Sequence, residues 1–241
     1  MSATPATEEL FREDADLLGC EAVVTAAGDG AVQLDRTVFY PQGGGQAGDA
    51  GWLVLADGRQ IAVVDTRKGP EPGQILHLLA DPSQAAGLAA GERLVARIDA
   101  DRRQAHRRFH SATHLLCALV PHPVDGCSIT AQYARLDFHM SEPLEKQALT
   151  EGLSRFIAAA RPVTTRWITE AELDANPQLV RSMSVQPPRG TGRVRLVEIE
   201  GVDLQPCGGT HVRNTADIGP LIVTKIEKKS AMTRRVILGF A

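Results

Sequence analysis

Short apolar runs separated by turn residues fill the chain from Cys20 to Asp99, and they set the fold class of its first part. Each run is rich in Val, Ile and Leu: CEAVVTA, AVQLDRTVFY, GWLVLA, QIAVVDT, QILHLLA and RLVARID. The Asp57-Gly58 pair between two runs is a good signal for a two-residue hairpin, and Gly28-Asp29-Gly30 also lies between runs. Evenly spaced strands of this kind predict a small barrel or sandwich.

A helical periodicity replaces the strand pattern at Asp99 and continues to Pro121. Its apolar stripe consists of Ala105, Phe109, Ala112, Leu116 and Leu119. A second amphipathic helix is expected from Glu142 to Ala160. Strand patterns then return in VTTRWIT, RVRLVEIEG, PLIVTKIEK and RRVILGF, with a short helix near TEAELDAN. We therefore predict an α+β fold with an N-terminal β-barrel domain over residues 1–95 and an α+β domain over 96–241, whose long helix packs against an antiparallel sheet.

Composition narrows the classes of partner. A chain of 241 residues with 43% hydrophobic content can bury one large core or two modest ones. The formal net charge of −3 requires any RNA contact to use local basic patches. The four cysteines are unevenly spaced, which argues against a disulfide framework. We see no targeting segment and no apolar run of about 18 residues, so we expect a cytoplasmic protein with no membrane contact and no obligate protein partner.

A histidine pair lies inside the first predicted helix. His110 and His114 in HSATH are one helical turn apart, so both imidazoles can converge on one ion. On a helical wheel they lie away from the apolar stripe, on the side of Arg103, Arg107 and Cys117, which favours a site facing a cleft over core histidines. No Glu follows the first His, so the segment is not the HExxH motif of zinc peptidases.

A second pair lies in PCGGTH, where Cys207 and His211 flank Gly208 and Gly209. The glycines predict a loop that can fold both side chains onto a metal, although a tight turn with an incidental cysteine fits the pattern alone. Nitrogen and sulfur ligands in two pairs are typical of zinc. Four protein ligands would close the tetrahedron, whereas a working zinc keeps one position open. Three alternatives follow: the site expands to five-coordinate, one residue binds weakly, or zinc mainly shapes the pocket. His211 is the ligand that either completes the site or yields its place to water.

Four stretches taken in order resemble a known family. They are TVFYPQGGGQAGDAG (Thr37–Gly51), HSATHLL (His110–Leu116), ARLDF (Ala134–Phe138) and PCGGTHV (Pro206–Val212). This set is similar to the editing domain of alanyl-tRNA synthetase and to the freestanding alanyl-tRNA editing proteins, over nearly the entire chain. The resemblance implies zinc-dependent hydrolysis, in trans, of seryl-tRNA(Ala) and also of glycyl-tRNA(Ala), with the acceptor end of the mischarged tRNA(Ala) as partner.

One segment departs from the synthetase pattern. Where synthetase editing domains usually read QKGS, this chain has VDGCS at Val124–Ser128, and the freestanding editors are similar in lacking the glutamine. Cys127 therefore gains no support from the resemblance as a nucleophile. We expect it to be a small buried thiol.

The resemblance also suggests residues that act on the substrate. Thr37 is the candidate for a contact with the serine hydroxyl, although strand propensity alone also explains a threonine there. The backbone can approach a ligand closely at Gly43, Gly44 and Gly45, although these glycines could equally form a turn. Thr37 and Gln46 are the two candidate catalytic residues.

Arg103 and Arg107, in DRRQAHRR, are the candidate phosphate contacts. Asp203 and Gln205, just before the loop, are candidates to hydrogen-bond the metal ligands. Two alternatives to the editing hydrolase stay open at this point. One is a non-catalytic, zinc-stabilised RNA-binding module, and the other is a deacylase of a different mischarged tRNA.

Overall fold

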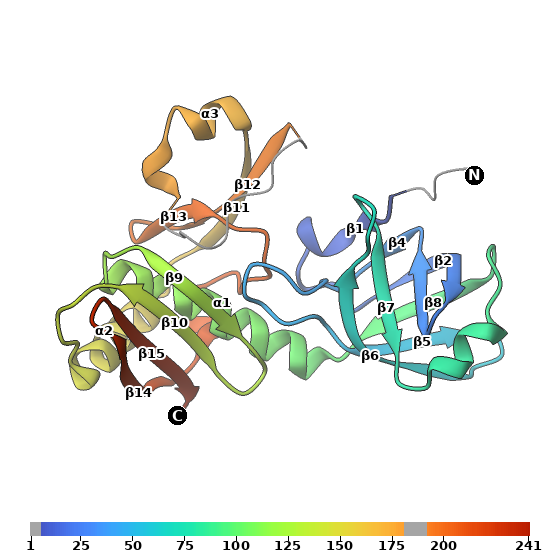
Figure 1. Cartoon of the computed structure of the whole chain (residues 1–241), viewed down its shortest axis with the longest axis horizontal. Helices are drawn as coiled ribbons and strands as arrows, with labels where there is room; N and C mark the ends of the chain where they lie inside the picture. The colour runs from blue at the N-terminus through green and yellow to red at the C-terminus, as the bar shows by residue number, and fades with distance from the viewer. Residues whose placement is uncertain (1–5, 181–191) are drawn as a thin grey trace. The chain divides into compact units, whose positions relative to one another are not determined.

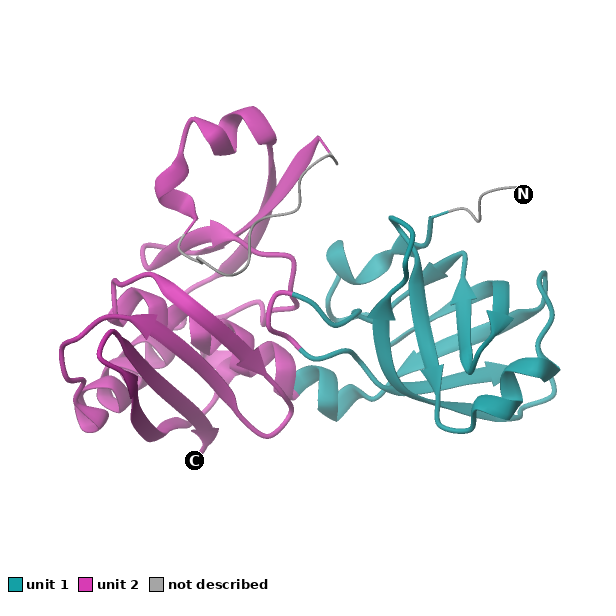
Figure 2. Cartoon of the chain, viewed as in Figure 1, with its two compact units in different colours: residues 1–43, 47–104 teal, residues 44–46, 105–241 magenta. Residues whose placement is uncertain are grey.

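The computed structural model describes residues 6–180 and 192–241 and shows a mixed α/β protein with a closed barrel and antiparallel sheets (Figure 1). The chain divides into two compact units (Figure 2). Unit 1 contains Met1–Gly43 and Ala47–Gln104, and unit 2 contains Gly44–Gln46 and Ala105–Ala241. The division into domains at residues 1–95 and 96–241 stays a prediction.

Unit 1 is built on a closed six-stranded barrel. Around the barrel its strands follow the order β2 (Gly19–Gly28), β3 (Ala31–Leu34), β7 (Ile75–Leu79), β6 (Gln60–Lys68), β5 (Gly51–Leu55) and β8 (Arg93–Ile98), which pairs with β2. Every neighbouring pair is antiparallel. All six predicted runs contribute a strand. The predicted hairpin at Asp57-Gly58 is confirmed, since it joins β5 to β6 and Gly58 has φ +84°.

The run AVQLDRTVFY differs from its predicted single strand. β3 ends at Leu34 because the Asp35 carboxylate turns back to accept a hydrogen bond from the Val23 N–H at 2.7 Å. The next residues form β4 (Arg36–Thr37), which pairs in parallel with β1 (Glu8–Glu9). A polar side chain that can satisfy a neighbouring strand's backbone thus ends the ladder.

Unit 2 contains two antiparallel sheets and the greater part of the long helix. The four-stranded sheet has the order β14 (Leu221–Ser230), β15 (Thr233–Phe240), β10 (Ala134–His139) and β9 (Val124–Ile129). The three-stranded sheet has the order β11 (Val163–Thr169), β12 (Arg193–Ile199) and β13 (Asp203–Pro206). In the described residues the helices are α1 (Ala100–Leu119), α2 (Lys146–Ala158) and α3 (Glu170–Asp174), with short 3-10 turns at Leu10–Arg12, Pro82–Gly87, Pro177–Leu179 and Thr215–Ile218.

Helix α1 is buried on all sides from Phe109 to Cys117. Its apolar side belongs to the core of unit 2, together with residues of both sheets. Its histidine side lies off the apolar stripe, as predicted, but it is covered by β13 and the loop that follows. Cys117, which the helical wheel placed beside the histidines, is instead part of the core. A wheel describes one helix and does not show that a second sheet covers its polar face.

No helix among the described residues is long and apolar enough to cross a membrane.

Candidate metal centre

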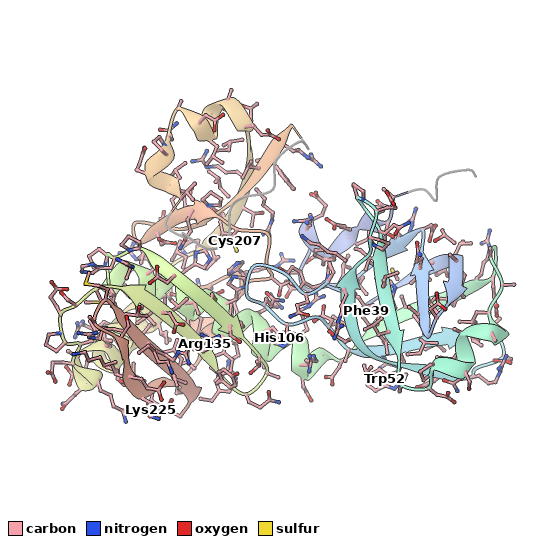
Figure 3. The ribbon with its side chains drawn as sticks, in the orientation of Figure 1. Phe39, Trp52, His106, Arg135, Cys207 and Lys225 are labelled. Carbon is pink, nitrogen blue, oxygen red and sulfur yellow. The ribbon has the colours of Figure 1, made fainter. Side chains whose placement is uncertain are left out.

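Two side chains from α1 and two from the loop after β13 converge in unit 2. The ligand atoms of His110, His114, Cys207 and His211 all lie within 4.8 Å of one another. Cys207 Sγ lies 3.4 Å from His110 Nε2 and 3.2 Å from His211 Nε2. Figure 3 shows Cys207 just beyond β13. Imidazole nitrogens and a thiol sulfur are metal-binding donor atoms, and the four together could hold a metal ion.

Each histidine of the cluster has its other ring nitrogen occupied. The Nδ1 contacts are His110 with Gln46 Oε1 at 2.7 Å, His114 with Asp203 Oδ2 at 2.8 Å, and His211 with Ser111 Oγ at 3.1 Å. When Nδ1–H donates to these oxygens, each Nε2 keeps its lone pair for the common centre. Gln46 and Asp203 therefore hold His110 and His114 in the tautomer that metal binding requires, whereas the Ser111 hydroxyl can either accept from His211 Nδ1 or donate to it.

Electrostatics favour a thiolate at Cys207. Burial raises the pKa of the Cys207 thiol, but its interactions with His110 and His211 outweigh burial and hold the pKa well below its ordinary value. Burial also holds the pKa of His211 well below its own ordinary value, so His110 and His114 are the imidazoles that carry the opposing charge. The Gly209 N–H also donates to Cys207 Sγ at 3.4 Å. At His114, burial lowers the pKa, while Asp203 and Cys207 raise it to about 10. In the absence of a metal, the cluster is thus stabilised by opposite charges on sulfur and imidazole.

The backbone of the loop is fixed by two buried arginines. Arg195 Nη1, from β12, donates to the carbonyls of Cys207 and Gly209, both at 3.0 Å. Arg107 Nε donates to the His211 carbonyl at 2.8 Å. The sequence reasoning missed Arg195, although a charged residue inside the apolar run RVRLVEI was a visible signal. These bonds prevent the loop from withdrawing its ligands from the centre.

Two glycines are required by close packing beside the cluster. A Cβ on Gly209 would lie 2.1 Å from His110 Cε1. A Cβ on Gly45, which has φ +85°, would lie 2.8 Å from Cys127 Sγ. Cys127 was expected to be a small buried thiol; its side chain is half-buried, and burial raises its pKa to about 12. Gly45 thus serves packing here, and the predicted approach of Gly43, Gly44 and Gly45 to a ligand stays a prediction.

Gln46 is fully buried and connects the two halves of the cluster. Its Oε1 faces His110 Nδ1 and accepts from the Thr210 N–H at 3.1 Å, and its Nε2 donates to the Thr210 hydroxyl at 3.0 Å. These contacts describe a positioning residue, and a direct catalytic role stays a prediction. Asp203 and Gln205 flank His114, as predicted, with Gln205 Nε2 2.8 Å from Asp203 Oδ2.

Thr37 lies in unit 1 and is fully buried. Its hydroxyl is 2.8 Å from His77 Nε2 and accepts from the Phe39 N–H at 3.0 Å. His77 Nδ1 faces the Val32 carbonyl at 2.9 Å, so Nδ1 carries the proton and Nε2 accepts from Thr37. The hydroxyl therefore already has both a donor and an acceptor partner, and its predicted contact with substrate stays a prediction.

The two candidate phosphate contacts are also buried, Arg103 at 1% and Arg107 at 8% exposure. Arg103 forms an ion pair with Asp49 and donates to the carbonyls of Val38 and Ala15. Arg107 anchors the metal loop, as described above. Both guanidiniums stabilise the fold where they stand, and phosphate binding by either stays a prediction.

Comparisons with known proteins identify the family of the chain. Residues 194–237, which include Cys207 and His211, match the family model of the threonyl and alanyl tRNA synthetase second additional domain. Residues 14–102 match the class II (A) tRNA synthetase family. The alanyl-tRNA editing protein AlaX-M of Saccharolobus solfataricus is 32% identical over 234 residues, a match that covers 95% of this chain and 97% of that protein. The chain belongs to the alanyl-tRNA editing protein family.

Other relatives place the chain within this family in the same way. AlaX-M of Methanosarcina acetivorans is 33% identical over 241 residues, covering 95% of this chain and 97% of that editing protein. The alanine–tRNA ligase of Metallosphaera sedula is 34% identical over 233 residues, which cover 93% of this chain but 25% of the ligase. The similarity to editing proteins thus extends over both units, including the helix that carries His110 and His114.

Proposed function

We propose that this protein is a trans-editing hydrolase that cleaves the ester of mischarged seryl-tRNA(Ala), and also that of glycyl-tRNA(Ala). The membership of the alanyl-tRNA editing family supports the substrate class. The observation that carries the chemistry is the buried His110, His114, Cys207 and His211 cluster, whose imidazoles turn Nε2 to one point. The acceptor end of the tRNA is the part of the substrate that must reach this point.

We propose zinc as the ion that these four side chains hold. Imidazole nitrogens and thiolates are its usual ligands. When bound, zinc polarises an ester carbonyl and lowers the pKa of a bound water toward neutrality, which is the chemistry that ester hydrolysis needs. The chain's own part is to hold the ligands in place. Asp203 and Gln46 orient imidazoles, and Arg107 and Arg195 fix the loop.

Four protein ligands leave a tetrahedral ion without an open position. Of the three imidazoles, His211 has the longest Nδ1 contact, 3.1 Å, and its partner is a neutral hydroxyl instead of a carboxylate or an amide. We therefore propose His211 as the ligand that gives up its position when substrate binds. The variant His211→Ala is then expected to retain zinc better than Cys207→Ala does.

Discrimination against alanine requires a contact with the serine hydroxyl. A buried site that pairs with a hydroxyl disfavours the analogue without it by up to about 10⁴- to 10⁵-fold. Thr37 is the residue that we propose for this contact, and it would exchange its bond to His77 for one to the substrate. Replacing Thr37 with Val then reduces the preference for serine over alanine and leaves the zinc content unchanged.

The decisive experiment measures deacylation of seryl-, glycyl- and alanyl-tRNA(Ala) by protein of known zinc content. The wild type is expected to hydrolyse the first two and to spare alanyl-tRNA(Ala). Cys207→Ala should lose both zinc and activity, whereas Cys20→Ala, a matched thiol in unit 1, should lose neither. Similar hydrolysis of alanyl-tRNA(Ala) would refute editing.

Two other outcomes would favour the alternatives. The four filled ligand positions favour a non-catalytic RNA-binding module, which binding of tRNA by zinc-loaded protein without turnover would support. If the protein hydrolyses only a different mischarged tRNA, the proposed substrate is wrong, but the proposed reaction class, ester hydrolysis, stands.

A further inference from the structure

A tryptophan and an arginine stack on the three-stranded sheet of unit 2. The Arg193 guanidinium carbon lies 4.2 Å from the centroid of the Trp167 ring. Arg193 is exposed and Trp167 is half-buried. An exposed cation–π pair contributes little to stability, so stability alone is a weak reason for such a pair. Its position in the sheet points to another role.

The register places this pair on the sheet face that carries the metal-centre contacts. Directly paired residues of antiparallel strands point to the same side, as do residues two apart on one strand. The paired rows on this face are Asp203 with Ile199, Gln205 with Val197, and Trp167 with Arg195, followed by Arg193. Asp203 and Gln205 contact His114 at one end of the face, and Trp167 lies at the other.

Arg195 connects Trp167 to the metal loop. It is the strand partner of Trp167, and its guanidinium donates to the carbonyls of Cys207 and Gly209. The Trp167–Arg193 pair is therefore separated from the metal loop by a single side chain. The opposite face of the same strands carries an ordinary exposed ion pair, Arg166 with Glu198 at 3.7 Å.

We propose that Trp167 and Arg193 form the platform that stacks the terminal adenine of the tRNA, with the guanidinium beside the last phosphates. This inference rests on the proposed function. The ester is carried by the terminal ribose, and the adenine is attached to the same ribose. A base-binding surface must therefore lie one nucleotide's width from the metal centre. Aromatic rings and Arg guanidinium planes are the groups that stack unpaired RNA bases.

The first test uses fluorescence and does not depend on hydrolysis. The chain has two tryptophans, and the second, Trp52, lies on β5 in unit 1, so Trp52→Phe leaves Trp167 as the only indole reporter. This variant is titrated with an uncharged RNA hairpin that ends in single-stranded ACCA, and with the same hairpin lacking the final A. Filter binding measures the complex independently.

Saturable quenching of Trp167 by the first hairpin, with little quenching by the second, is the expected result. Bound RNA that leaves the Trp167 emission unchanged overturns the inference. Failure of the RNA to bind overturns it as well. Wild-type deacylation distinguishes the stacking platform from the proposed function. Turnover of seryl-tRNA(Ala) without quenching of Trp167 would refute the platform and leave the proposed function standing.

The second test separates binding from folding. Stacking of one base is worth about 1–3 kcal/mol, so Trp167→Ala should raise the KM for seryl-tRNA(Ala) about 5- to 150-fold, with kcat and zinc content little changed. Trp167→Phe should recover most of this loss, and Arg193→Ala should raise KM in the same direction. Trp52→Ala is the matched control and should leave KM unchanged. A loss of zinc and kcat with unchanged KM would instead assign Trp167 a structural role and overturn the inference.

Discussion

His77 makes the stability of unit 1 depend on pH in a way that can be calculated from its surroundings. The side chain is fully buried, with Nδ1 donating to Val32 and Nε2 accepting from Thr37. Burial lowers the pKa of His77 from 6.5 to about 4, although the Val32 carbonyl acts in the opposite direction. Folded protein therefore keeps His77 neutral at pH values where the unfolded chain protonates it.

The sign and size follow from linkage. Because the folded-state pKa is the lower one, the unfolded state binds more protons between pH 6.5 and pH 4. The stabilisation is fully present above the unfolded pKa and is lost as pH falls toward the folded pKa. Two titration curves with these midpoints give a loss of about 2 kcal/mol at pH 5 and about 3 kcal/mol at pH 4.

The assay is urea unfolding at several pH values in a Trp167→Phe background, where Trp52 on β5 reports on the barrel. The comparison variant is His77→Gln, whose amide offers an N–H donor group and a carbonyl acceptor but does not titrate. We expect this variant to be less stable at pH 8, because it loses the edge-on contact with Phe39, and to show a smaller loss on acidification. Equal pH slopes in the two proteins would refute the reasoning, because His77 would then not be the group that titrates.

Three further predictions concern the metal centre. Gln46→Ala should weaken zinc binding about 10- to 100-fold, measured by chelator competition, whereas the control Gln42→Ala, at an exposed position, should not. If Gln46→Ala is fully active at saturating zinc, Gln46 is a positioning residue; if it is inactive there, Gln46 acts in catalysis. Gly209→Ala should abolish zinc binding, because its Cβ would collide with His110, whereas Gly28→Ala, which meets nothing within 4 Å, serves as the folding control. Removing zinc should lower the thermal midpoint reported by the tryptophan of unit 2 alone, and a matching fall in the barrel signal would contradict independent units.

The elements that the sequence predicted well are those with strong local periodicity. The barrel strands and α1 have runs of apolar residues at a regular spacing, and the structure confirms them. β9 was not predicted, because VDGCSI contains Gly, Asp and Ser and has little strand propensity by itself. It is a strand because it pairs with β10 through a tertiary contact.

In the site, too, the residues within short motifs could be predicted, whereas the contacts between distant segments could not. His110, His114, Cys207 and His211 are visible as two short motifs, each with local spacing that suits a metal. Their supporting contacts join residues far apart in the chain and are set by the fold. Ser111 is inside the HSATH motif, yet only the folded loop reveals that it holds His211.

The short segment Gly44–Gln46 belongs to unit 2, although the chain on either side of it belongs to unit 1. A fragment that begins at residue 96 would therefore lack the amide that faces His110 and the Thr210 N–H. The metal-binding half cannot be excised, or exchanged with that of a relative, by a single cut. In recombination between members of the family, the FYPQGGGQ segment and the two metal motifs must be inherited together.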